Sequence, residues 1–243
     1  VAAPRPMADG ITYVALGDSV AAGLGAGPIL DECGHTAGAY PVLVAAAHSL
    51  TLTQLSCSGA TISDVASTQL PQVPADTNYL SVQVGANDIG FVPLLQACAP
   101  SRSNAACSKA VKQSRAYLNG AFRDNAIALF TAIKAQASNA RLIVVGYPRL
   151  FGSRDCSPLT AFSAPERIWL NDLTNLLDTR LRQAAQTVGA AFVNPLSRFN
   201  AHPWCARTAW VNGPVDPAVA SFHPNALGQT NGYLPLMNMQ FLS

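Results

Sequence analysis

Four short polar segments contain the residue types that could carry out covalent chemistry. They are Gly17-Asp18-Ser19, Ser58-Gly59-Ala60, Gly85-Ala86-Asn87-Asp88 and Ser221-Phe222-His223-Pro224-Asn225. A serine hydroxyl is a poor nucleophile at its ordinary pKa, so it needs a base within hydrogen-bond reach, and histidine has a suitable pKa. We therefore expect Ser19 to be a nucleophile and His223 to be its general base.

The same segments could stabilise the charge that develops when a serine attacks a carbonyl group. The backbone N–H groups of Ser19 and Gly59 and the side-chain amide of Asn87 could donate to one oxyanion, as acyl transfer requires. Taken alone, the Asp18-Ser19 segment is weak evidence, because Asp or Ser after a strand also caps the next helix. The combination with Gly59 and Asn87 favours acyl transfer.

The other histidines have simpler interpretations. His48 ends an apolar helical pattern, which indicates a partly buried structural residue. His35 and His202 lie in cysteine-containing loops, where we expect a solvated or hydrogen-bonded side chain. Among the four histidines, His223 is the best candidate for the base.

Alternating apolar segments and helical patterns must position these residues. The five expected strands are Thr12–Leu16, Leu50–Leu55, Leu80–Val84, Leu142–Val145 and Ala190–Val193. The expected helices are Ala39–His48, Ile62–Ser67, Ile89–Ala97, Ala105–Ala137 with a break near Gly120, Pro165–Val188, and Asn225–Phe241 with a bend near Gly232 or Pro235. This alternation predicts a doubly wound parallel sheet, whose ligands bind beyond the carboxyl ends of the strands.

Composition narrows the possible classes of protein. The 243 residues suit one α/β domain, with residues 1–10 as an extended N-terminal segment. Only 12% of residues are charged and the net charge is +2 without a basic stripe, so we expect no nucleic-acid partner. No apolar run approaches the roughly 20 residues of a membrane helix, so we expect no stable membrane insertion. The start at Val1 without methionine suits the remnant of a cleaved signal peptide.

Six cysteines indicate an oxidising compartment if they are paired. They lack the close spacing of a zinc or thioredoxin-like site. Six cysteines allow 15 pairings, and six buried thiols are the alternative interpretation. We expect disulfides, and hence secretion.

The four polar segments occur in the order and approximate spacing of the SGNH (GDSL) hydrolase blocks. The whole chain resembles the secreted actinobacterial lipases, esterases and phospholipases of that superfamily. The resemblance implies Ser19 as nucleophile, Gly59 and Asn87 as oxyanion donors and His223 as base. It also implies a three-layer, flavodoxin-like fold with a five-stranded parallel sheet and helices on both faces. The disulfides that it implies are Cys33 with Cys57, Cys98 with Cys107, and Cys156 with Cys205.

The group that orients His223 departs from the usual pattern of that superfamily. The carboxylate that is usual three residues before the histidine is absent, and Ala220 stands there instead. Asp216 is the nearest upstream carboxylate, but Pro217 restricts it to an extended conformation that suits a solvent-facing turn. We therefore predict a dyad, in which a backbone carbonyl of Ala220 or Ser221 accepts from the ring N–H.

The sequence thus predicts a secreted, monomeric serine esterase or lipase that needs no metal or cofactor and acts on acyl lipids or other acyl esters. A carbohydrate O-deacetylase or an acyltransferase would share the same chemistry, and a non-catalytic lipid-binding protein would share the same fold. Six apolar residues near the expected site favour a fatty acyl substrate over a sugar: Leu24, Ile29, Leu30, Phe91, Phe151 and Trp204.

Overall fold

A parallel sheet of five strands forms the centre of the computed structural model, which describes residues 10–98, 104–154, 156 and 162–241. The strands are β1 (Thr12–Gly17), β2 (Thr51–Gln54), β3 (Tyr79–Gln83), β4 (Arg141–Val145) and β5 (Ala191–Val193). Their spatial order is β2-β1-β3-β4-β5, which is the flavodoxin-like order that we expected. Of the N-terminal segment 1–10, expected to be extended, residues 1–9 lie outside the described residues.

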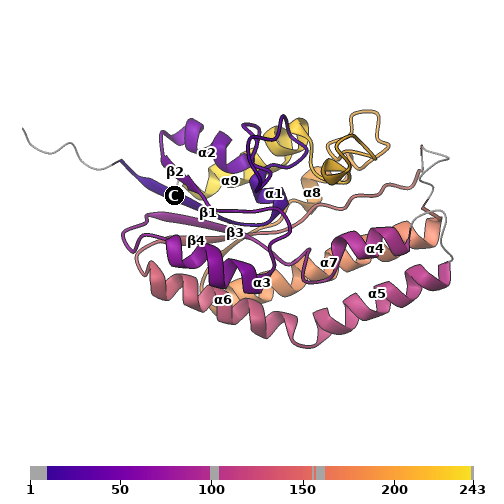
Figure 1. The fold of residues 1–243 in the computed structure, drawn as a ribbon, viewed down its shortest axis with the longest axis horizontal. Helices are drawn as coiled ribbons and strands as arrows, with labels where there is room; N and C mark the ends of the chain where they lie inside the picture. Colours follow the sequence, from indigo (N-terminus) through magenta and orange to yellow (C-terminus); the bar gives the residue numbers. More distant parts are fainter. Residues whose placement is uncertain (1–9, 99–103, 155, 157–161, 242–243) are drawn as a thin grey trace, which may run out of the picture.

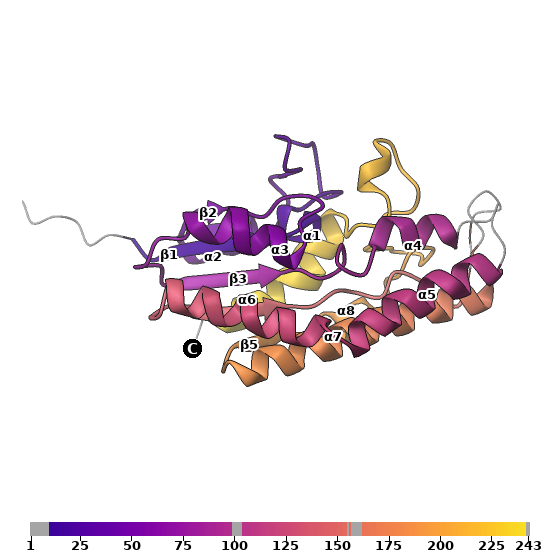
Figure 2. The ribbon, with the colours of Figure 1, turned by 60° about the horizontal axis from the view of Figure 1, so that its bottom comes forward.

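Helices cover both faces of the sheet, as Figures 1 and 2 show. On one face α2 (Tyr40–His48) packs against α9 (Leu234–Phe241). On the other face α7 (Ala164–Thr187) packs against α5 (Asn104–Asn119) and α6 (Phe122–Gln136). The expected three-layer α/β fold is therefore confirmed, and the apolar stripe of α7 forms core.

Glycines set two of the helix boundaries. The long helix expected to break near Gly120 is divided there into α5 and α6. The helix α4 (Phe91–Ala97) begins two residues later than expected, because Gly90 precedes it with a φ of 73°. The expected C-terminal helix is also divided, since its first turns form the wider helix η4 (Gly228–Tyr233) before α9.

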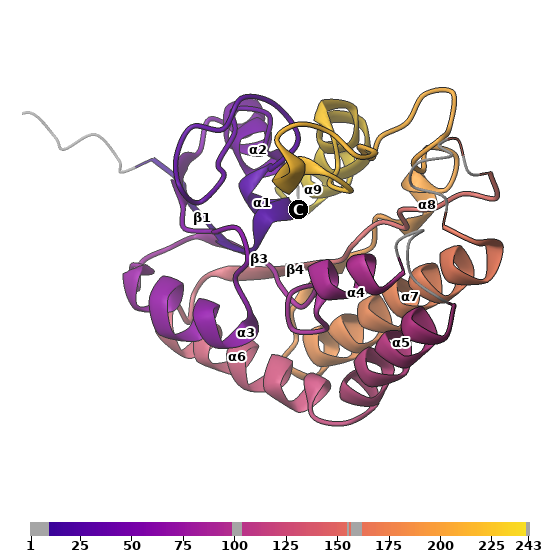
Figure 3. The ribbon, with the colours of Figure 1, turned by 45° about the vertical axis from the view of Figure 1, so that its right-hand side comes forward.

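The carboxyl ends of the strands carry the less regular parts of the chain, which come forward in Figure 3. The short helix α1 (Ser19–Ala22) follows β1 directly. The remaining short elements are α3 (Ile62–Asp64), η1 (Val65–Gln69), η2 (Leu70–Gln72), α8 (Leu196–Phe199) and η3 (Ala218–Ala220). The sequence patterns had not indicated α1, η2, α8 or η3.

Three disulfides join Cys33 to Cys57, Cys98 to Cys107 and Cys156 to Cys205. These are the pairs that the resemblance implied. In the part of the chain that the structure describes, none of the helices has both the length and the hydropathy to cross a bilayer. Nor do the described side chains include a cluster of histidine, cysteine and carboxylate groups that could hold a metal ion.

Candidate active site

The turn after β1 places Ser19 at the carboxyl end of the sheet. Gly17 has a φ of 132°, and a Cβ here would lie 2.1 Å from the carbonyl oxygen of Gln83 in β3. The Gln69 side chain bonds both polar backbone groups of Gly17, accepting from its N–H at 2.8 Å and donating to its carbonyl at 2.9 Å. Only glycine fits this close approach, and the buried amide fixes it.

Asp18 caps α1, of which Ser19 is the first residue. Asp18 Oδ1 accepts from the Val20 N–H at 3.0 Å, and Oδ2 accepts from the Tyr147 hydroxyl at 2.5 Å. The capping interpretation is therefore correct for Asp18. The Ser19 hydroxyl takes no part in the cap and has another partner.

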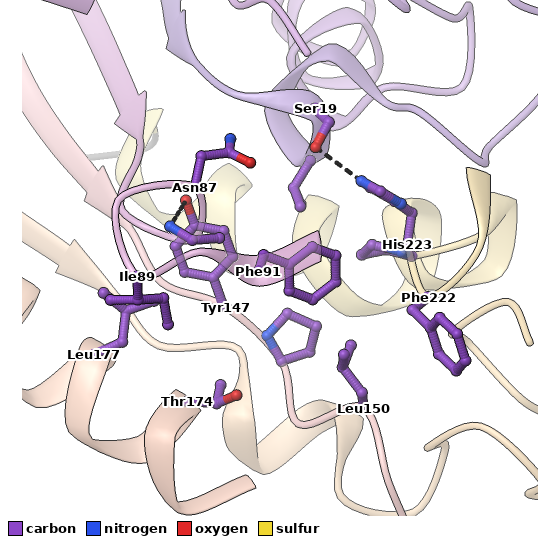
Figure 4. Close-up of a pocket in the computed structure, with 14 residues that line it drawn as sticks. Ser19, Asn87, Ile89, Phe91, Tyr147, Leu150, Thr174, Leu177, Phe222 and His223 are labelled. Carbon is purple, nitrogen blue, oxygen red and sulfur yellow. Dashed lines mark hydrogen bonds between the residues drawn. The ribbon is translucent and has the colours of Figure 1, made fainter. Parts of the chain in front are cut away.

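That partner is His223, as Figure 4 shows. Its Nε2 lies 2.8 Å from Ser19 Oγ, and only 8% of Ser19 and 6% of His223 are exposed. His223 Nδ1 lies 2.9 Å from the Ser221 carbonyl oxygen, which can only accept. A neutral ring therefore carries its proton on Nδ1 and accepts from Ser19 through Nε2. The Ala220 carbonyl faces the Asn212 amide at 3.4 Å instead.

The backbone next to His223 has a strained conformation. Phe222 has a φ of 59°, in the left-handed region that bulky residues rarely adopt. Its ring centroid lies 5.5 to 5.9 Å from those of Phe151, Phe162 and Trp204. We call these four residues the aromatic cluster. Packing in this cluster holds Phe222, and with it the position of the histidine.

Asn212 links the two halves of the candidate site. Its backbone N–H donates to the His223 carbonyl at 2.9 Å, and its Nδ2 donates to the Gly25 carbonyl at 3.0 Å. Gly25 lies just beyond α1. One residue therefore joins the segment after Ser19 to the loop that carries the histidine.

The three candidate oxyanion donors lie beyond β1, β2 and β3. Ser19 is the first residue of α1, where an N–H has no acceptor within the helix. The Gly59 N–H, in a turn where φ is 84°, bonds no other described residue. Asn87 Nδ2 donates one hydrogen to the Ala60 carbonyl at 3.0 Å, so its second hydrogen can point elsewhere. Each donor thus has an N–H to offer.

Asp88 fixes the turn after β3 against the segment that follows Gly59. Its two carboxylate oxygens lie 3.2 and 3.1 Å from the Ile62 N–H. Burial raises the pKa of the Asp88 carboxyl to about 6, although the hydrogen bond from the Ile62 N–H lowers it. This link holds the Asn87 and Gly59 turns together.

Burial also controls the protonation of the groups nearest to Ser19. It lowers the pKa of the His223 imidazole below its ordinary value, while the hydrogen bond to Ser221 works in the opposite direction. A lowered pKa keeps the ring neutral at neutral pH, as a general base requires. Burial raises the pKa of the Asp18 carboxyl to about 7, although the Tyr147 hydroxyl and the Val20 N–H stabilise its anion.

A narrow pocket of about 50 Å³ adjoins Ser19 and His223 (Figure 4). Its walls are mainly apolar, and they include Ile89, Phe91, Pro148, Leu150 and Leu177. Such walls can bury hydrocarbon but offer few partners to a group with many hydroxyls.

Of the six apolar residues expected near the site, only Phe91 lines this pocket. Phe151 lines a smaller neighbouring pocket of about 30 Å³, and Trp204 packs within the aromatic cluster. The other three lie beyond the end of α1, one of them buried and two exposed: Leu24, Ile29 and Leu30. Apolar character in a loop does not specify the direction of a side chain, so the sequence could not show which of the six residues line the pocket.

Comparison with known proteins identifies the family of this chain. The model of the GDSL-like Lipase/Acylhydrolase family matches residues 15–230. The chain belongs to this family. It is also 34% identical to Lipase 1 of Streptomyces coelicolor over 242 residues, which cover 98% of this chain and 88% of that protein. As a member of the GDSL-like acylhydrolases, it is a carboxylic ester hydrolase of the lipase or esterase type.

Two solved structures of GDSL-like relatives are similar over nearly their whole length. Phospholipase A1 from Streptomyces albidoflavus NA297 has a TM-score of 0.89 and 31% identity, covering 95% of this chain and 99% of that chain. The extracellular lipase from Streptomyces rimosus has a TM-score of 0.88 and 32% identity, covering 94% of this chain and 99% of that chain. The fold therefore has close counterparts in a phospholipase A1 and a lipase.

Sequence reasoning missed three residues that support the site of this GDSL-like acylhydrolase. Gln69 left a weak signal in the sequence, because it follows the apolar Val65 by four residues, which is the spacing of one face of a helix. Asn212 and Phe222 left none. Their contributions come from loop conformation, which residue type alone does not specify.

Proposed function

We propose that this protein is a secreted serine esterase or lipase that hydrolyses acyl esters through a Ser19–His223 dyad and an acyl-enzyme. The observation that carries the proposal is the 2.8 Å contact between Ser19 Oγ and His223 Nε2, two residues that line a mainly apolar pocket. A buried, neutral histidine next to a serine is the arrangement that activates a hydroxyl nucleophile.

In the proposed mechanism, Ser19 Oγ attacks the ester carbonyl carbon and its proton moves to His223 Nε2. The N–H groups of Ser19 and Gly59 and the Asn87 amide stabilise the oxyanion. The bond between the carbonyl carbon and the alcohol oxygen then breaks, and Nε2 returns the proton to that oxygen. Water attacks the acyl-enzyme with help from the same histidine, which releases the carboxylic acid and restores the Ser19 hydroxyl.

Replacement of Ser19 or His223 by alanine tests the dyad. We expect turnover of short p-nitrophenyl esters to fall by at least about a thousandfold with a nearly unchanged melting temperature, since neither role is structural. Ser67→Ala is the matched control, because Ser67 is an exposed serine of η1 whose hydroxyl donates to the Ser63 carbonyl of α3. An organophosphonate should label wild type but not Ser19→Ala. Wild-type turnover in Ser19→Ala would contradict the proposal.

Pocket chemistry favours acyl lipids over acetylated sugars. The walls next to Ser19 are mainly apolar, and the relatives named above are a phospholipase A1 and lipases. A panel of esters from acetyl to palmitoyl, with a phospholipid and an acetylated sugar, tests this preference. We expect some preference for medium or long acyl chains, and activity confined to acetylated sugars would contradict it.

Secretion and a monomeric, single-domain state complete the proposal. Three disulfides are typical of proteins that fold in an oxidising compartment, and one similar structure is that of an extracellular lipase. Secreted protein should show no thiol reactive to Ellman's reagent in denaturant and should sediment as one monomeric species. Six reactive thiols would contradict secretion.

A further inference from the structure

A wide groove of about 400 Å³ adjoins the narrow pocket of about 50 Å³. Phe91, Phe222 and His223 line both hollows, whereas Ser19 and Asn87 line only the narrow pocket. The ring centroids of Phe91 and His223 lie 6.0 Å apart, so these rings form part of the wall between the hollows. In Figure 4, Asn87 and Phe222 are drawn on opposite sides of the Ser19–His223 pair.

Ester cleavage assigns a different part of the substrate to each hollow. The carbonyl oxygen must face the oxyanion donors, which include Asn87 in the proposed mechanism. The alcohol oxygen must face His223 Nε2, because this atom returns the proton to the leaving group. The acyl part therefore stays with the pocket that Ser19 and Asn87 line. The alcohol part extends past His223 toward the groove.

The groove offers hydrocarbon contacts and few polar ones. No Asp, Glu, Lys or Arg side chain is among the described residues that line it. Its two polar side chains besides the histidine are Gln96 and Ser221. The Ser221 hydroxyl is already engaged with the backbone of Val215, accepting from its N–H at 3.1 Å and donating to its carbonyl at 3.4 Å. A sugar would leave most of its hydroxyls without partners here.

We infer that this groove binds a hydrocarbon chain on the alcohol part of the ester, so that the preferred substrates are apolar on both sides of the bond that breaks. The inference rests on the proposed function, because it uses His223 as the group that protonates the leaving alcohol. Val92 of α4 and Val219 of η3 line the groove while 53% and 60% exposed. A bound chain covers both, which makes them specificity-determining residues.

Butyrate esters of alcohols from methanol to hexanol, assayed below their aggregation limit, test the inference. Each added methylene that enters the groove should raise kcat/KM by up to about fourfold. The variant Val92→Asp with Val219→Asp should flatten this rise, so that kcat/KM for the hexyl ester falls toward that for the methyl ester. Ile11→Asp with Met239→Asp is the matched control, since these residues are 52% and 57% exposed. Neither control residue lines the groove.

The outcomes separate this inference from the proposed function. Equal kcat/KM for methyl and hexyl butyrate in the wild type would overturn the inference while leaving the serine mechanism intact. The inference would also be overturned if the Asp pair instead flattened the dependence of kcat/KM on acyl length in methyl esters, because the groove would then hold the acyl chain. If the Asp pair lowers the melting temperature more than the control pair does, the double variant Val92→Asn with Val219→Asn takes its place. We expect the same flattening from this second pair. An active Ser19→Ala protein, by contrast, would overturn the proposed serine mechanism itself.

Discussion

The nucleophile side and the histidine side of the site are built in different ways. Ser19 follows the inner strand β1, and buried glutamine amides fix the surrounding backbone: Gln69 on Gly17, Gln83 on Gly146 and Gln229 on Val20. His223 lies in the loop between α8 and η4, where the described elements include only the short helix η3. The aromatic cluster, Asn212 and one disulfide hold that loop.

This difference separates stability from catalysis. Backbone groups on the nucleophile side belong to the core, so changes there should lower the free energy of unfolding first. The histidine side depends on a few side-chain contacts within an irregular loop, so changes there should lower turnover before they lower stability. Each prediction below tests one side against the other.

Gly17→Ala should have the largest effect on stability. Its Cβ would lie 2.1 Å from the Gln83 carbonyl oxygen, at a φ that only glycine readily adopts. We expect a loss of about 3 kcal/mol or more in the free energy of unfolding, measured by urea denaturation. Gly90→Ala is the control, since Gly90 also has a positive φ but a Cβ there would meet no atom within 4 Å. A cost for Gly17→Ala no larger than that of the control would contradict this view of the nucleophile side.

The pH dependence of kcat/KM should report the histidine side. Protonated His223 cannot accept the Ser19 proton, so activity should fall about tenfold per pH unit below the pKa of His223. Because burial lowers this pKa, the fall should begin below the ordinary histidine value of about 6.5. Asp18 has a pKa raised to about 7, and Asp18→Asn tests whether it contributes. If the pH at which kcat/KM falls is shifted in Asp18→Asn, the fall reports Asp18, on the nucleophile side, instead of His223.

The same division explains what the sequence could and could not predict. The strands and the positions of Ser19, Gly59 and Asn87 at their carboxyl ends follow from apolar segments that end in polar, glycine-rich turns, whereas the strand order came from the family resemblance. Periodicity of this kind directly reports burial in regular elements. The strained Phe222 and the bond from Asn212 to Gly25 depend on loop contacts between residues far apart in sequence. No local pattern reports such contacts.

Asn212→Ala should lower turnover more than stability. The substitution removes the hydrogen bond to Gly25 but keeps the backbone bond to His223, so the loop should remain folded yet hold the imidazole less firmly. We expect kcat to fall by about tenfold to a hundredfold, because a misplacement of about 1 Å has effects of this size. Asn125→Ala is the control, because it removes an asparagine side-chain bond of similar length, to the Tyr117 hydroxyl, away from the site. Equal losses of melting temperature with unchanged kcat in both variants would contradict a positioning role.

The smallest effect should come from Asp216→Asn. His223 Nδ1 already has an acceptor in the Ser221 carbonyl at 2.9 Å, whereas Asp216 is exposed on the loop before η3 and bonds no other described side chain. A carbonyl selects the same ring tautomer as a carboxylate but supplies a dipole instead of a charge. In enzymes that rely on a carboxylate, its replacement by an amide costs about 10⁴ in turnover. Loss of a distant, solvated charge should instead change kcat by less than about tenfold, or roughly 1.4 kcal/mol in the barrier. Steady-state kinetics with one p-nitrophenyl ester can measure this difference. A loss of a thousandfold with normal folding would make Asp216 the third member of a triad and would place a decisive charge on the histidine side.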